Sequence, residues 1–86
     1  MRVEPVFKPG DHIINESAGD MAIVDKVTPK NYYHFKAYYG NMFHEFRDAK
    51  DKNCDLQVNY QKFFRLCTEE EAEKLDEMIL EKKAKI

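Results

Sequence analysis

Residues 31–48 read NYYHFKAYYGNMFHEFRD, and this stretch decides the fold. Two runs rich in aromatic residues flank the pair Gly40-Asn41. Glycine in the first position of a two-residue connection is typical of a β-hairpin with a type II′ turn. The stretch therefore predicts two antiparallel strands in which Tyr39 lies opposite Met42.

This turn fixes the predicted register of the hairpin. Phe35 then faces Phe46, Ala37 faces His44, and Lys36 faces Glu45. Because side chains alternate across a strand, the residues divide into two sets. The core candidates are Tyr33, Phe35, Ala37, Tyr39, Met42, His44 and Phe46. The charged pair of Lys36 and Glu45 marks the opposite face as solvated.

The solvated face of the hairpin is the candidate binding surface. Exposed aromatic rings with interspersed cations are typical of surfaces that anchor a protein partner or stack nucleic-acid bases. The alternative is that the C-terminal helix or another strand covers these rings. If they are exposed, truncating Tyr38 and Phe43 to Ala removes partner binding with little loss of stability. The candidate binding residues are Tyr32, His34, Lys36, Tyr38, Phe43 and Arg47.

Three further short strands accompany the hairpin. A turn at Pro9-Gly10 precedes the first of them, and Pro29 ends the second because proline cannot donate to a ladder. Ala49–Asp55 reads as a charged loop, and Gln57–Lys62 is ambiguous because few of its residues are apolar. The three strands are expected at His12–Asn15, Met21–Val27 and Phe63–Cys67.

A helix is predicted to begin at Thr68. Thr68 and Glu71 have the T-x-x-E spacing of a capping box, in which each side chain bonds the backbone N–H of the other residue. Acidic residues follow at once and lysines close the segment, which suits the helix dipole. The apolar stripe of this helix is Ala72, Leu75, Met78, Ile79 and Ile86.

Five short antiparallel strands and one terminal helix predict a mainly β (α+β) fold, either a small curled sheet or a partly open barrel. At 86 residues the chain is one domain. We expect residues 1–67 to form the small β-barrel. Residues 68–86 are expected to form an amphipathic helix that packs on it or extends from it.

Composition and charge exclude several classes of protein. No run approaches the roughly 20 apolar residues of a membrane span, and the first residues do not read as a signal peptide, so a cytoplasmic protein is expected. The net charge is −2, which disfavours general nucleic-acid binding. Cys54 and Cys67 are expected as free thiols rather than a disulfide.

Residue patterns give no support for catalysis or metal binding. Asp51-x-Asn53-x-Asp55 resembles the opening of a calcium loop, but Leu56 replaces the required glycine and Lys62 replaces the bidentate glutamate. The three histidines and two cysteines lack zinc-ligand spacing. The single serine lacks a nucleophile-elbow pattern. No catalytic residue, metal or cofactor is predicted, so the chain is expected to be non-enzymatic.

Two motifs resemble those of short, mostly uncharacterised proteins of bacterial phages and mobile elements. The motifs are Phe7-Lys8-Pro9-Gly10-Asp11 and Phe64-Arg65-Leu66-Cys67-Thr68-Glu69-Glu70-Glu71. In that group an F-x-x-G-D start leads into an SH3-like barrel, and an R-L-A-T-x-E-E segment leads into a terminal helix. Cys67 stands here where alanine is usual. The resemblance implies a five-stranded SH3-like barrel in a phage or prophage setting, and it implies no catalytic residue.

Together these features predict a small binding module that acts on a protein partner. The resemblance extends this to a modulator or inhibitor of a host protein in the host cytoplasm. The alternative is a nucleic-acid-binding barrel that uses the aromatic and basic hairpin face.

Overall fold

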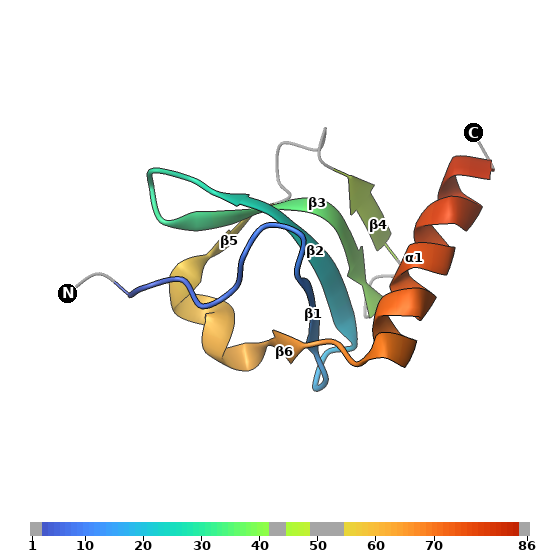
Figure 1. Cartoon of the computed structure of the whole chain (residues 1–86), viewed down its shortest axis with the longest axis horizontal. Helices are drawn as coiled ribbons and strands as arrows, with labels where there is room; N and C mark the ends of the chain where they lie inside the picture. Colours follow the sequence, from blue (N-terminus) through green and yellow to red (C-terminus); the bar gives the residue numbers. More distant parts are fainter. Residues whose placement is uncertain (1–2, 42–44, 49–54, 85–86) are drawn as a thin grey trace.

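A computed structural model of the chain describes residues 3–41, 45–48 and 55–84 (Figure 1). These residues form a mainly β structure with one C-terminal helix, as predicted, and the sheet curls without closing into a barrel. The six described strands are β1 (His12–Asn15), β2 (Asp20–Val27), β3 (Tyr32–Gly40), β4 (Glu45–Asp48), β5 (Asp55–Gln57) and β6 (Arg65–Leu66). A 3₁₀ helix, η2 (Val58–Phe63), precedes β6, and the α-helix α1 spans Glu69–Ala84.

The strands pair antiparallel in the order β4-β3-β2-β1-β6, and β5 also pairs with β3. Since β2 occupies one edge of β3, strands β4 and β5 share its other edge at opposite ends. β4 lies along Ala37–Gly40 and β5 along Tyr32–His34. The last strand therefore lies beside the first, where Leu66 is opposite Ile13.

The hairpin forms, but its predicted register is wrong by four positions. Tyr39 lies opposite Phe46, and Gly40 lies opposite Glu45. The connection between β3 and β4 therefore contains four residues, 41–44, rather than two. The predicted pairs Phe35–Phe46 and Lys36–Glu45 do not occur. The predicted partners of Ala37 and Tyr39, which are His44 and Met42, lie outside the described residues, and Ala37 and Tyr39 pair with Asp48 and Phe46 instead. Of the connection, residues 42–44 lie outside the described part of the chain.

Gly40 serves packing rather than a tight turn. Its φ is not in the left-handed region, unlike that of Gly10 in the predicted Pro9-Gly10 turn, where φ is 92°. A Cβ atom at Gly40 would lie only 3.2 Å from Cε1 of Tyr38. The glycine thus leaves room for the Tyr38 ring.

An irregularity in the ladder splits the predicted core face of the hairpin. The pairing shifts between Ile23–Ala37 and Val24–Phe35, so one residue of β3 is extra at this point. Strict alternation would place Phe35 and Ala37 on one face. Instead Phe35 joins Tyr33 in one core cluster, whereas Ala37 joins a second cluster. The single inner face predicted from the sequence is therefore wrong.

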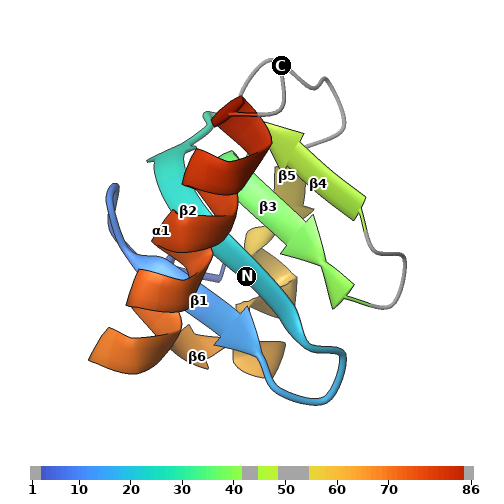
Figure 2. The same cartoon turned by 90° about the vertical axis from the view of Figure 1, so that its right-hand side faces the viewer.

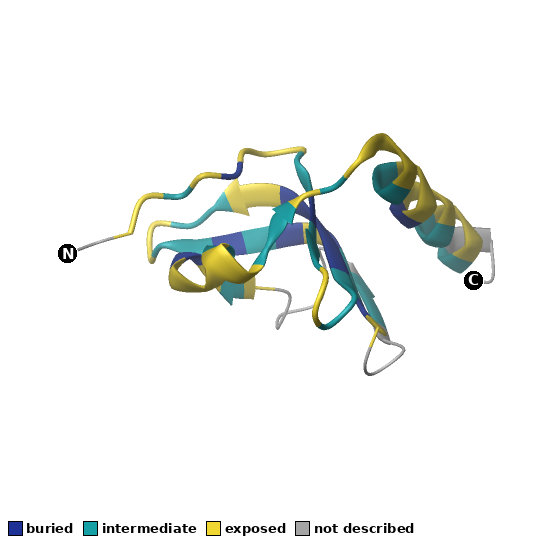
Figure 3. Ribbon diagram, turned by 90° about the horizontal axis from the view of Figure 1, so that it is seen from below, coloured by how far each residue is buried: buried dark blue, intermediate teal, exposed yellow. Residues whose placement is uncertain are grey.

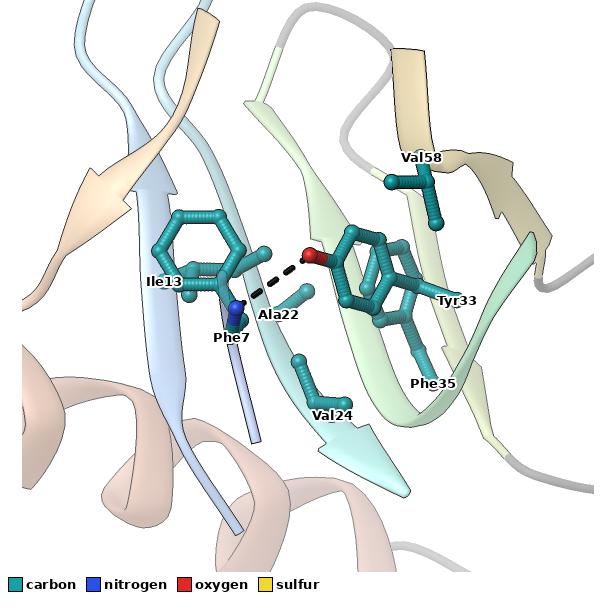
Figure 4. Packing of buried hydrophobic residues seen from close by; sticks show 7 residues of the cluster. All are labelled: Phe7, Ile13, Ala22, Val24, Tyr33, Phe35 and Val58. Atoms are coloured by element: carbon teal, nitrogen blue, oxygen red, sulfur yellow. Dashed lines mark hydrogen bonds between the residues drawn. The ribbon is translucent and has the colours of Figure 1, made fainter. Parts of the chain in front are cut away.

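The first cluster fills the hollow between the sheet, the N-terminal segment and η2 (Figure 4). The buried Tyr33 ring lies 5.8 Å from the ring of Phe7, and its hydroxyl accepts a hydrogen bond from the Phe7 N–H at 3.2 Å. The cluster is Phe7, Ile13, Ala22, Val24, Tyr33, Phe35 and Val58.

The second cluster lies on the opposite face, beneath α1. Figure 2 shows α1 lying in front of β1, β2 and β3. Leu75 is fully buried among Met21, Ile23 and Ala37. Met78 and Ile79 of the predicted stripe pack against this cluster from the helix, together with Tyr39 and Phe46 from the hairpin. Ile86 lies outside the described residues.

The predicted capping box of α1 is confirmed. The Thr68 N–H donates to Glu71 Oε1 at 2.8 Å, and the Glu71 N–H donates to Thr68 Oγ1 at 3.3 Å. Arg65 of β6 adds a two-pronged bond to the Glu71 carboxylate, at 2.8 and 2.9 Å. The cap therefore also joins the helix to the last strand.

Within the described ranges, no helix has the length and apolar character needed to span a membrane.

Candidate functional site

In the part of the hairpin that the structure describes, the outer face does not form an open aromatic surface. Tyr32 and His34 are half-buried, and His34 Nδ1 lies 2.5 Å from the Asp55 carboxylate of the neighbouring strand β5. Lys36 alone is exposed among the candidate residues that the structure describes. Strand β5, which the sequence did not predict, carries Asp55 and places it opposite His34.

Tyr38 belongs to the core rather than to a solvated face. Its ring stacks on Phe35 with centroids 6.0 Å apart and planes inclined by 12°. Its hydroxyl donates to Asp20 Oδ2 at 2.8 Å. The half-buried Arg47 lies opposite it in the ladder, and Phe43 lies outside the described residues. The structure thus does not present the five described candidates as an exposed set.

Exposed aromatic rings occur on η2 instead. Tyr60 is 47% exposed and Phe63 is 56% exposed. Their rings stack with centroids 6.3 Å apart and planes inclined by 24°. The Lys62 Nζ atom lies 5.4 Å from the centroid of the Phe63 ring. Two rings and a cation are therefore adjacent on the surface, and η2 is drawn mostly in the exposed colour in Figure 3.

The geometry of a 3₁₀ helix explains this arrangement. Such a helix has three residues per turn, so residues three apart share a face. Val58 is fully buried in the first core cluster, and Gln61, three residues later, points inward as well. Tyr60 and Phe63 share the outward face by the same spacing.

Gln61 holds the N-terminal segment against η2. Its Oε1 atom accepts from the Val6 N–H at 2.9 Å and from the Tyr33 hydroxyl, and its Nε2 atom donates to the Glu4 carbonyl at 2.8 Å. Val6, beside this contact, is 65% exposed.

The turn between β2 and β3 closes the same end of the molecule. The Asn31 side-chain amide donates to the Val3 carbonyl at 2.9 Å, and the Asn31 carbonyl accepts from the Val58 N–H at 3.1 Å. Val3 is 40% exposed. This end of the molecule lies opposite α1 in Figures 1 and 3. We call the surface formed by Val3, Val6, Tyr60, Lys62 and Phe63 the η2 surface.

The sequence does not predict the η2 surface, because the pattern of Gln57–Lys62 is ambiguous. Phe63 is predicted to open the last strand, but that strand begins at Arg65. A usable signal was present: Val58 and Gln61, like Tyr60 and Phe63, are three residues apart. That spacing fits a 3₁₀ turn better than the alternation of a strand.

Ionisable groups with clear pKa shifts lie at the junction of β6 and α1. Hydrogen bonds from Arg65 and from the backbone of Thr68 lower the pKa of Glu71 to about 2. Burial raises the pKa of the free Cys67 thiol to about 11. Cys54 lies outside the described residues. In the part of the chain that the structure covers, no three acidic, histidine or cysteine side chains are grouped to hold a metal ion.

Comparison with protein-family models, with curated proteins and with solved structures found no match for this chain.

Proposed function

We propose that this chain is a small, non-enzymatic module that binds a protein partner through the η2 surface. The observation that supports this proposal is the pair of exposed, stacked rings of Tyr60 and Phe63 beside Lys62. Aromatic residues supply large contact area and dominate the energetics of protein interfaces.

The η2 surface suits binding because it is already ordered. Gln61 fixes η2 to the N-terminal segment through two hydrogen bonds and to Tyr33 of β3 through a third. Val58 anchors the start of η2 in the core. Binding to such a surface costs little conformational entropy, which favours affinity for a given contact area.

The resemblance to phage and mobile-element proteins directs the search for the partner. It supports a prophage-encoded modulator or inhibitor that acts on a bacterial host protein in the cytoplasm. As part of the same proposal, the curled sheet is related to the SH3-like barrels of that group.

Nucleic-acid binding is the second candidate, because stacked rings beside a lysine also suit single-stranded bases. The net charge of −2 favours a protein partner. The same experiment separates the two candidates.

The test is capture of partners from a bacterial lysate by the tagged full-length chain, with and without nuclease, followed by mass spectrometry. The double variant Tyr60→Ser/Phe63→Ser is compared with the chain of unchanged sequence. Leu66→Ser is the matched control, because Leu66 is 56% exposed but lies on β6.

We expect one protein to be recovered by the unchanged chain and by Leu66→Ser, with or without nuclease. Its recovery by the double variant should fall at least about tenfold, as expected when interface anchors are lost. Equal recovery by all three chains contradicts the proposal. Recovery that disappears with nuclease favours nucleic acid instead.

A further inference from the structure

The surface of α1 that faces away from the sheet carries a single exposed leucine among acidic residues. Leu80 is 66% exposed. Residues three, four and seven positions earlier share its side of a helix, and these are Glu77, Asp76 and Glu73. All three are exposed, but the Asp76 carboxylate lies 2.9 Å from His12 Nε2 of β1 and so leans toward the sheet, which leaves Glu73 and Glu77 as the outward carboxylates. The outer face of α1 is therefore apolar at one point and negatively charged around it.

The η2 surface carries apolar side chains and two exposed lysines, Lys30 and Lys62, beside one exposed carboxylate, Glu4. Lys62 lies over the Phe63 ring. Lys30 is exposed in the turn whose next residue, Asn31, bonds both Val3 and Val58. The exposed leucine of α1 can pack on the exposed rings of the η2 surface. The carboxylates around the leucine can then pair with the lysines beside the rings.

These two surfaces cannot meet within one molecule. The η2 surface and α1 lie at opposite ends of the molecule (Figures 1 and 3), whose longest dimension is 43 Å. A contact between them requires two copies. Because the two surfaces are different, the contact is heterologous and adds copies head to tail rather than closing a dimer.

We infer that the occupant of the η2 surface includes a second copy of this chain, which presents the outer face of α1 around Leu80. This inference rests on the proposed function in that it uses the same surface. The contact is small, so the association is weak and depends on concentration. Salt weakens it because the charges are exposed.

The test uses sedimentation velocity of the full-length chain from micromolar to millimolar concentration, at low and at moderate salt. Two charge reversals are made, Lys62→Glu on the η2 surface and Glu77→Lys on α1. Each should weaken association at least about tenfold, since each replaces attraction by repulsion. A Lys74→Glu variant is the control for net charge, because Lys74 lies on α1 away from the side of Leu80.

An equimolar mixture of the two variants gives the decisive result. The Glu77→Lys variant keeps Lys62, and the Lys62→Glu variant keeps Glu77, so one native contact can form between them. We expect two chains that are monomeric alone to associate when mixed. The inference is overturned if the unchanged chain stays monomeric at millimolar concentration. It is also overturned if both variants still associate on their own, or if mixing them does not restore association.

The inference and the proposed function can fail separately. Glu77→Lys leaves the η2 surface intact, so it should still capture the lysate partner if the proposed function holds. Loss of capture by Tyr60→Ser/Phe63→Ser, with no self-association of the unchanged chain, would overturn the inference alone.

Discussion

At the scale of single residues, the tyrosines of β3 show how position decides the role of one residue type. Tyr33 is fully buried, and its hydroxyl accepts from the backbone N–H groups of Val6 and Phe7, at 3.0 and 3.2 Å. The Tyr38 hydroxyl donates to Asp20 across the sheet. Both side chains contribute mainly to the fold, whereas Tyr60 is the exposed tyrosine with a stacked neighbour.

Tyr33→Phe should destabilise the chain by roughly 1–3 kcal/mol, because it leaves the buried N–H of Phe7 without its acceptor. Urea denaturation measures this change, and amide hydrogen exchange at Val6 and Phe7 should become faster. Tyr60→Phe is the control and should shift stability by less than about 0.5 kcal/mol. Equal effects of the two substitutions would contradict the role of the Tyr33 hydroxyl.

Tyr38→Ala should also cost stability, about 2 kcal/mol, contrary to the expectation from the sequence that Tyr38 is solvated. The loss arises from the stacking on Phe35 and the bond to Asp20. The free energy of unfolding from urea titration measures it. A change in the free energy of unfolding near zero would contradict a core role for Tyr38.

Cys67 should react slowly with thiol reagents, because burial raises its pKa to about 11 and the thiolate is the reactive form. In a Cys54→Ser background, the alkylation rate should still rise between about pH 9 and 10.5. A small free thiol such as glutathione is the control, and its rate levels off earlier. A plateau for Cys67 below pH 9 would contradict the raised pKa.

At the scale of elements, features set by contacts between residues close in the sequence were predicted correctly. Features that depend on contacts between distant residues were not. The capping box at Thr68 is a contact within four residues, so the sequence alone was sufficient to place the start of α1. Beside the β3–β4 connection, Tyr38 packs next to Gly40 and its hydroxyl bonds Asp20 of β2, which is distant in the sequence. The Gly-Asn pair therefore suggested a tight turn that packing overrides.

The junction of β6 and α1 should make the stability of the chain depend on pH. The pKa of Glu71 is about 2 in the folded state, below its value in the unfolded chain. The carboxylate therefore contributes stability above the unfolded pKa, and the contribution is lost as the pH falls from about 5 to 2.

Glu71→Gln should lower the melting temperature at pH 7 and have little effect near pH 2, because glutamine keeps the cap but not the charge. Thermal melting at both pH values measures the difference. Thr68→Ala is the control, since it removes the cap at about 1 kcal/mol and should do so at either pH. An effect of Glu71→Gln that is equal at both values would contradict the role of the Arg65 pair.

At the scale of the whole molecule, the sheet is covered on both faces, and this the sequence did not reveal. The irregularity beside Phe35 sends Tyr33 and Phe35 to one face and Ala37 and Tyr39 to the other. The fold class and the terminal helix follow from composition, turn residues and capping. The candidate surface does not, because it depends on which aromatic residues the two core clusters leave outside.

The most direct measurement of the central proposal maps the contact surface on the chain itself. The captured partner is titrated into isotope-labelled protein, and backbone amide shifts are followed by NMR. We predict that the largest changes fall in residues 3–7 and 58–63, with small changes along β3 and β4. Changes concentrated at Tyr32, His34 and Lys36, with none in η2, would contradict the account.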